Sequence, residues 1–183
     1  MTQAVVQNGL LSIADVRLSP NHDQRPVQTV ISLIVVHCIS LPPGQFGGEW
    51  IDRLFMNRIR GDEHQSFADL KGLRVSSHLL IRRDGQVVQY VPFHLRAWHA
   101  GVSSFEGVEK CNDYSIGIEL EGADEVAYEP VQYQRLAAAV TALMKSYPQI
   151  TPQRIVGHSD IAPGRKTDPG PAFDWELFRR HLD

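Results

Sequence analysis

The chain has 183 residues, 43% of them hydrophobic and 21% charged, which predicts a folded domain with a core and excludes a disordered or fibrous chain. Its formal net charge is −3 and no face gathers Lys and Arg, so no nucleic-acid partner is expected. The two cysteines form no CxxC motif and the N-terminus has neither a basic start nor a long apolar run, so we expect free thiols, no signal peptide, no membrane association and a cytoplasmic location.

The first third of the chain is expected to contain an irregular lead-in, one buried strand and one helix. A single domain should span 1–183, with 1–28 as a polar, irregular lead-in. The apolar, β-branched run at 30–37 predicts a buried strand that ends at His37. Apolar residues at helical spacing then predict a helix over 49–59.

The middle of the chain is expected to form strands. Two β-rich runs within 76–93 flank the Asp-Gly dipeptide at 84–85, which favours a hairpin with a type I′ turn. A further strand is predicted over 114–122, and its alternation places Ile116, Ile118 and Leu120 on one face. Glu119 and Glu121 share the other face, where we expect Glu121 to be the more exposed.

The C-terminal third is predicted to contain two helices and a stiff loop. The clearest helix spans 130–147, begins with a proline and carries one apolar stripe. A short strand at 154–158 leads into 157–170, whose Gly and Pro content indicates a loop without a helix. A last helix, capped by Asp174, is expected over 174–182. Strands and helices in this order predict an α/β (α+β) fold, a mixed sheet flanked by helices.

Two histidines at strand ends and an aspartate on the stiff loop are the candidate metal ligands. His37, His158 and Asp168 form a donor set typical of catalytic zinc, which takes three protein ligands and leaves a fourth position open. Because no HExxH motif is present, spacing alone leaves open that each histidine is an ordinary hydrogen-bonded residue. His78 is predicted to be structural, and Cys38 should point away from His37.

Several segments together resemble the zinc-dependent N-acetylmuramoyl-L-alanine amidases, which are related to peptidoglycan recognition proteins. The resemblance covers nearly the whole chain and is carried by VVHCISLPPGQFGG, VSSHLLIRRDGQVVQYVPF, RAWHAGVSSFEG, CNDYSIGIELEG and GHSDIAPGRKTDPGPAFDW. It implies a mixed sheet with zinc in a groove, held by His37, His158 and Asp168. It also implies that Glu119 and Lys166 act in catalysis.

The resemblance further implies hydrolysis of the amide between the lactyl group of N-acetylmuramic acid and L-alanine. The favoured substrates are 1,6-anhydro-muropeptides recovered in cell-wall recycling, and their removal limits induction of a chromosomal β-lactamase. We expect Arg74, Trp98 and Arg165 to contact the substrate, since arginine suits peptide carboxylates. Cys38 and Gly164 depart from the usual Asn and Glu, which bears on substrate preference. A peptidoglycan-binding module and an amidase of intact wall polymer are the alternatives, and the sequence does not indicate an oligomeric state.

Overall fold

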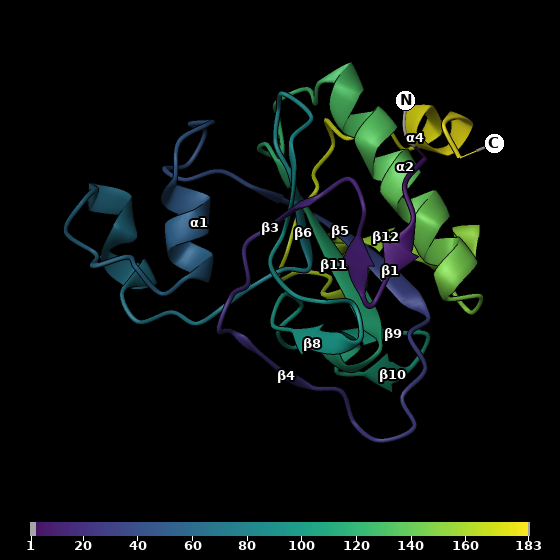
Figure 1. Ribbon diagram of the computed structural model, residues 1–183. Coiled ribbons are helices and arrows are strands. Elements are labelled where there is room, and N and C mark those ends of the chain that lie inside the picture. The colour runs from purple at the N-terminus through teal and green to yellow at the C-terminus, as the bar shows by residue number, and fades with distance from the viewer. Residues whose placement is uncertain (1–2, 183) are drawn as a thin grey trace.

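A six-stranded mixed sheet forms the centre of the molecule (Figure 1). The computed structural model describes residues 3–182. Four neighbouring strands run parallel, β6 and β7 pair antiparallel, and β3 joins β7 in parallel. In spatial order the strands are β12 (Ile155–Gly157), β5 (Leu33–Ile39), β11 (Ser115–Glu121), β6 (Leu79–Ile81), β7 (Val87–Gln89) and β3 (Asp15–Val16). The predicted mixed sheet with flanking helices is therefore confirmed.

Helices surround this sheet unevenly. Figure 1 shows the long α2 (Pro130–Ser146) and α4 (Trp175–Arg180) together on one side, and α1 (Trp50–Phe55) set apart on the other with the 3₁₀ helix η1 (Gln65–Leu70). Among residues 3–182, no helix has both the length and the apolar character that a membrane span requires. The remaining helical turns are η2 (Cys111–Asp113), η3 (Pro152–Arg154) and α3 (His158–Ile161).

The segment expected to be an irregular lead-in contains short strands and is built into the domain. Besides β3, it supplies β1 (Val6–Gln7), β2 (Leu10–Leu11) and β4 (His22–Gln24). The guanidinium of Arg25 donates hydrogen bonds to four backbone carbonyls, those of Phe93, Asn112, Asp113 and Ser115. Three two-stranded ribbons pair β1 with β2, β4 with β8 (Leu95–Ala97), and β9 (Ser104–Phe105) with β10 (Val108–Glu109).

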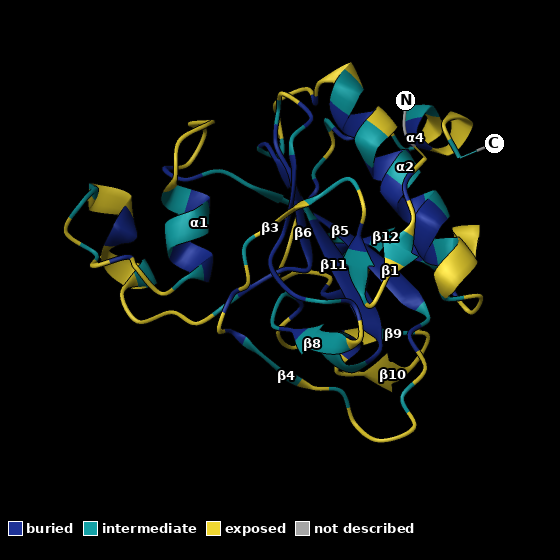
Figure 2. Cartoon of the chain, viewed as in Figure 1, coloured by how far each residue is buried: buried dark blue, intermediate teal, exposed yellow. Residues whose placement is uncertain are grey.

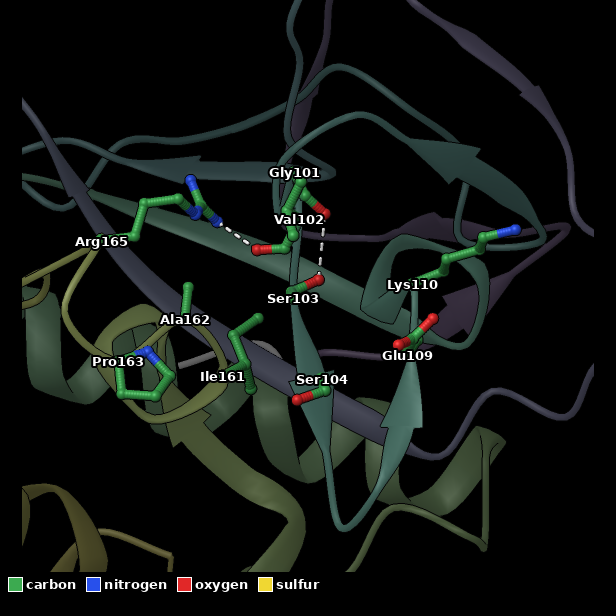
Figure 3. Close-up of a pocket in the computed structure, with 10 residues that line it drawn as sticks. All are labelled: Gly101, Val102, Ser103, Ser104, Glu109, Lys110, Ile161, Ala162, Pro163 and Arg165. Carbon is green, nitrogen blue, oxygen red and sulfur yellow. Dashed lines mark hydrogen bonds between the residues drawn. The ribbon is translucent and has the colours of Figure 1, made fainter.

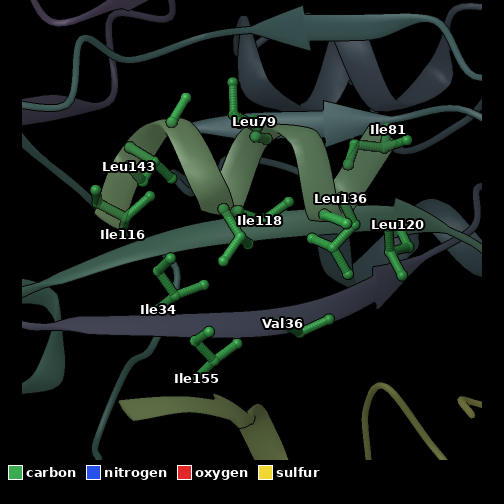
Figure 4. Packing of buried hydrophobic residues seen from close by; sticks show 14 of the residues in the cluster. Ile34, Val36, Leu79, Ile81, Ile116, Ile118, Leu120, Leu136, Leu143 and Ile155 are labelled. Atoms are coloured by element: carbon green, nitrogen blue, oxygen red, sulfur yellow. The ribbon is translucent and has the colours of Figure 1, made fainter. Parts of the chain in front are cut away.

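The main core lies between the sheet and α2. The predicted alternation along β11 is confirmed: Ile116, Ile118 and Leu120 are fully buried against α2, beside residues of β5 and β6 (Figure 4). The predicted helix stripe supplies the opposing side chains, Leu136, Val140 and Leu143. Figure 2 shows the central strands largely buried, whereas α2 has a buried and an exposed side. The other face of β5 and β11 is consequently free to carry polar side chains.

The predicted hairpin is present, but its turn type was wrong. The backbone N–H of Arg82 bonds the carbonyl of Gln86, which makes a three-residue loop rather than a two-residue one. Only Gly85 has a positive φ, +84°, whereas a type I′ turn also needs one at Asp84. Gly85 also donates to the Arg82 carbonyl, so the loop is a type I turn followed by a glycine bulge.

Two other boundaries differ from the prediction for local reasons. Strand β5 continues past His37 to Ile39, because β11 pairs with it along its full length. Helix α1 ends at Phe55 rather than 59, since Asn57 adopts a left-handed conformation with φ of +59°. The cap predicted for α4 is confirmed, with the Asp174 carboxylate accepting from the N–H of Leu177 at 2.8 Å.

Candidate metal centre

Parallel pairing of β5 and β11 creates the polar face of the sheet. His37 pairs with Glu119 in the register of these strands, so both side chains emerge side by side on the face opposite α2. Strand β12 lies on the other side of β5 and ends at Gly157, directly before His158. The three neighbouring parallel strands therefore bring His37, His158 and the carboxylate of Glu119 close together on one face of the sheet.

Potential metal-ligand atoms of His37, His158 and Asp168 form a nearly equilateral triangle at this place. His37 Nδ1 lies 3.0 Å from His158 Nδ1 and 3.0 Å from Asp168 Oδ2. The third side, from His158 Nδ1 to Asp168 Oδ2, is 3.1 Å. Both imidazoles are buried, and within residues 3–182 this is the one His/Cys/Asp/Glu group whose ligand atoms could hold a metal ion.

The triangle fits a tetrahedral metal ion. Ligand atoms bound 2.0–2.1 Å from tetrahedral zinc lie about 3.3 Å from one another, close to the three separations observed. Three protein ligands also leave one coordination position open. Burial lowers the pKa of His37 to about 4, so its imidazole is neutral, as a metal ligand must be. Burial acts to raise the pKa of Asp168, but its close contacts with the two imidazoles outweigh it and hold the pKa below its usual range.

The segment that carries His158 and Asp168 is more ordered than the sequence predicts. Residues His158–Ile161 form the helical turn α3, so the expectation of a loop without a helix was wrong there. The turn forms because the Asp160 carboxylate accepts the N–H of Gly157 at 2.7 Å, which caps it. The N–H of Ser159 donates to the carbonyl of Asp168 at 3.0 Å, and this contact brings Asp168 back beside His158.

His99 is a member of the site that sequence reasoning missed. Its Nδ1 lies 2.9 Å from His37 Nε2, and its Nε2 lies 3.0 Å from the hydroxyl of Ser115. Burial and the neighbouring His37 lower the pKa of His99 well below its ordinary value. The residue lies within the RAWHAG segment, but its spacing from His37 carries no signal because the contact is tertiary.

Glu119 combines a half-buried position with an unsatisfied oxygen. Its Oε2 is enclosed and has no hydrogen-bond partner among the described residues. Burial raises the pKa of Glu119 well above its usual value, the negative Asp168 raises it further, and Lys166 opposes both. A carboxyl group whose pKa is raised in this way takes up a proton more readily than an exposed one, as an acid–base group must.

A pocket with a volume of about 230 Å³ covers the cluster. Glu119, Lys166 and Trp98 all line it together with the three potential ligands. Lys166 is exposed at its rim, two residues before Asp168. The structure therefore brings six of the eight predicted site residues to one pocket.

The two remaining arginines lie outside this pocket. Arg165 donates to the carbonyls of Ala100 and Val102, each at 2.7 Å, and borders a separate cavity of about 550 Å³ (Figure 3). Arg74 is exposed and lines a third cavity of about 320 Å³. That cavity shares Leu54 and Leu73 with the pocket over the cluster, so the two are adjacent.

Three nearby residues have structural contacts. His78 is fully buried and its Nδ1 accepts the N–H of Gly117, which agrees with the predicted structural role. The Cys38 thiol donates to Asp124, and the thiol lies outside the three-ligand group. The expectation that Glu121 is exposed was wrong: it is 2% exposed and accepts N–H bonds from Gly47 and Arg83, because the 43–49 loop folds over it.

The mixed sheet and the His/His/Asp cluster are typical of a metal-dependent hydrolase, and comparison with known proteins identifies the family. Residues 26–171 match the N-acetylmuramoyl-L-alanine amidase family, and the chain therefore belongs to that family. It is 62% identical over 161 residues to the 1,6-anhydro-N-acetylmuramyl-L-alanine amidase AmpD of Salmonella typhimurium strain SL1344, covering 88% of this chain and 86% of the relative.

Solved structures agree with the sequence matches. A crystal structure of a selenomethionine AmpD derivative has a TM-score of 0.95 and 56% identity, covering 98% of this chain and 99% of its own. The amidase AmiD of Escherichia coli, solved with the substrate anhydro-N-acetylmuramic acid-L-Ala-D-γ-Glu-L-Lys, has a TM-score of 0.59 and 30% identity, covering 98% of this chain and 65% of its own.

Proposed function

We propose that this chain is a zinc-dependent amidase that hydrolyses the bond between the lactyl group of 1,6-anhydro-N-acetylmuramic acid and L-alanine in muropeptides. The observation that carries the proposal is the triangle of His37, His158 and Asp168, with Glu119 on the adjacent strand. Two imidazole nitrogens and one carboxylate oxygen form a typical donor set of a catalytic zinc site. The three residues of the triangle line one pocket together with Glu119 and Lys166.

Relatives support the choice of substrate. AmpD proteins that are 51–62% identical to this chain are named 1,6-anhydro-N-acetylmuramyl-L-alanine amidases. A more distant relative binds an anhydro-muramyl tripeptide. We further propose that the reaction belongs to peptidoglycan recycling, takes place in the cytoplasm and removes fragments that induce a chromosomal β-lactamase. Locating the native protein by cell fractionation tests the compartment.

The carboxyl group of Glu119 moves the proton in the proposed reaction. Zinc, when bound by His37, His158 and Asp168, polarises the amide carbonyl and lowers the pKa of water. Glu119 accepts a proton from the water as the water oxygen attacks the amide carbon. As the carbon–nitrogen bond breaks, Glu119 delivers that proton to the nitrogen, which leaves as the amine of L-alanine. The raised pKa of Glu119 suits a group that both accepts and delivers a proton.

Charged side chains around the pocket hold the oxyanion and the peptide. Lys166 lines the pocket beside the cluster and stabilises the negative charge that develops on the carbonyl oxygen. Trp98 offers an apolar surface in the same pocket. Arg74 holds a stem-peptide carboxylate in the adjacent cavity, which adjoins the pocket over the cluster through Leu54 and Leu73. Arg165 is engaged by backbone carbonyls and takes no part in this scheme.

The proposal is tested by measuring bound zinc and the reaction products on one preparation. Anhydro-N-acetylmuramyl-tripeptide is incubated with the zinc-loaded protein, and mass spectrometry is expected to detect free anhydro-N-acetylmuramic acid and the tripeptide. Parallel incubation with cross-linked sacculi separates a recycling enzyme from an amidase of intact polymer. Binding of the muropeptide without cleavage identifies a recognition module. Either equal cleavage of sacculi or binding alone contradicts the proposal.

A further inference from the structure

We propose that His99 is a positioning residue whose Nδ1 accepts a hydrogen bond from His37 Nε2 and so directs the lone pair of His37 Nδ1 at the metal. The inference rests on the zinc site of the proposed function. His99 itself contributes no atom to the triangle of ligand atoms.

The contacts of His99 form a relay that ends on a hydroxyl group. His37 Nε2 and His99 Nδ1 are 2.9 Å apart, and His99 Nε2 is 3.0 Å from Ser115 Oγ. A neutral imidazole has one N–H donor and one acceptor nitrogen. When His37 offers the lone pair of Nδ1 to a metal, its proton is on Nε2 and must be donated. His99 Nδ1 is then the acceptor, and His99 Nε2–H donates to Ser115.

The protein backbone completes the matching arrangement at the other histidine. His158 Nε2 lies 3.1 Å from the carbonyl of Ala100, and a carbonyl only accepts hydrogen bonds. The Arg165 Nη2 donor is farther from this nitrogen, at 3.4 Å, so the carbonyl contact favours a proton on His158 Nε2 and leaves the lone pair of Nδ1 directed at the cluster. Consecutive residues, His99 and Ala100, thus orient both imidazoles of the triangle. Such outer contacts commonly set the tautomer and ring orientation of metal-binding histidines.

Two further features hold this pair of residues in place. The side-chain oxygen of Asn112 accepts the backbone N–H groups of His99 and Ala100, at 3.0 and 2.8 Å. The His99 ring lies against Gly117 on β11, where an added Cβ would approach its Cγ to 2.5 Å. The absence of a side chain at Gly117 is therefore what allows the ring to reach both His37 and Ser115.

A matched pair of substitutions isolates the acceptor at the Nδ1 position. In His99→Asn, the amide oxygen can occupy the place of Nδ1 and accept from His37. In His99→Gln, the amide reaches the place of Nε2 and leaves His37 without its acceptor. Zinc affinity is measured by chelator competition on folded protein, with far-UV circular dichroism and thermal unfolding of the metal-free variants as the check on folding.

We expect His99→Gln to weaken zinc binding by about 10–100-fold, as loss of an outer-shell partner typically does, and His99→Asn to stay within about threefold of wild type. Equal losses in both variants, or wild-type affinity in His99→Gln, overturns the inference. Wild-type protein that binds no zinc refutes the proposed metal site instead.

Two measurements keep the inference testable if a variant fails to fold. In zinc-loaded wild type, ¹⁵N–¹H spectra of the imidazoles should show protons on His37 Nε2 and His99 Nε2, and a proton on His99 Nδ1 overturns the assignment. Ser115→Ala removes the last acceptor of the relay without changing either ring. It is expected to weaken zinc binding by about threefold or more. Unchanged affinity there shows that the relay does not orient His37.

Discussion

Replacing Glu119 with glutamine separates its proposed role in proton transfer from a role in holding the metal. The amide keeps nearly the same shape but cannot accept and deliver the proton. We expect kcat to fall by about 10²–10⁴-fold, as is typical for loss of a general acid–base group. That loss corresponds to about 3–5 kcal/mol in the activation free energy. Zinc content should be unchanged, because Glu119 lies outside the three-ligand group.

The same substitution should stabilise the metal-free fold at neutral pH. Burial raises the pKa of Glu119, so the folded chain binds this proton more tightly than the unfolded chain does. The resulting stability is fully present below the unfolded pKa and is lost as pH rises towards the folded pKa. Between these two values each pH unit removes about 1.4 kcal/mol, equivalent to about 3–5 °C in Tm for a chain of this length.

Thermal unfolding of the chelator-treated proteins from pH 4 to pH 8 measures this effect. The Tm of Glu119→Gln should match wild type at the acid end and exceed it increasingly as pH rises. Bound zinc and kcat are determined separately on zinc-loaded protein. Full zinc with near-normal kcat refutes proton transfer by Glu119, and loss of zinc identifies Glu119 as a ligand. A constant Tm difference across the pH range refutes the raised pKa.

The other substitutions test the ligand set, the peptide contact and the close packing at the site. Asp168→Ala should lose zinc and turnover together, and full zinc occupancy with a normal rate rules out Asp168 as a ligand. Arg74→Ala should raise KM more than it lowers kcat, and an unchanged KM assigns Arg74 to the solvated surface. Gly117→Ala should destabilise the fold by about 1–3 kcal/mol in urea unfolding and weaken zinc binding, because the new Cβ would lie 2.5 Å from the His99 ring. Wild-type stability in that variant contradicts the packing described here.

Local patterns in the sequence determined most of the secondary structure and part of the site. Alternation along 114–122 correctly assigned Ile116, Ile118 and Leu120 to the core, because neighbouring side chains on a strand point to opposite faces. The same pattern assigned Glu119 to the polar face. Placing His37 and His158 near strand ends and Asp168 on the next loop anticipated their meeting, and the motifs shared with the amidase family correctly indicated the fold.

Tertiary structure alone decided which polar side chains form hydrogen bonds within the protein and which face the pocket. His99 meets His37 across 62 residues, and Arg165 turns to the carbonyls of Ala100 and Val102 rather than to the pocket. Glu121 is buried because a distant loop covers the end of its strand. Periodicity reports which face of an element a residue occupies, whereas these outcomes depend on which other segment covers that face. Such contacts join residues far apart in the chain, so no local pattern encodes them.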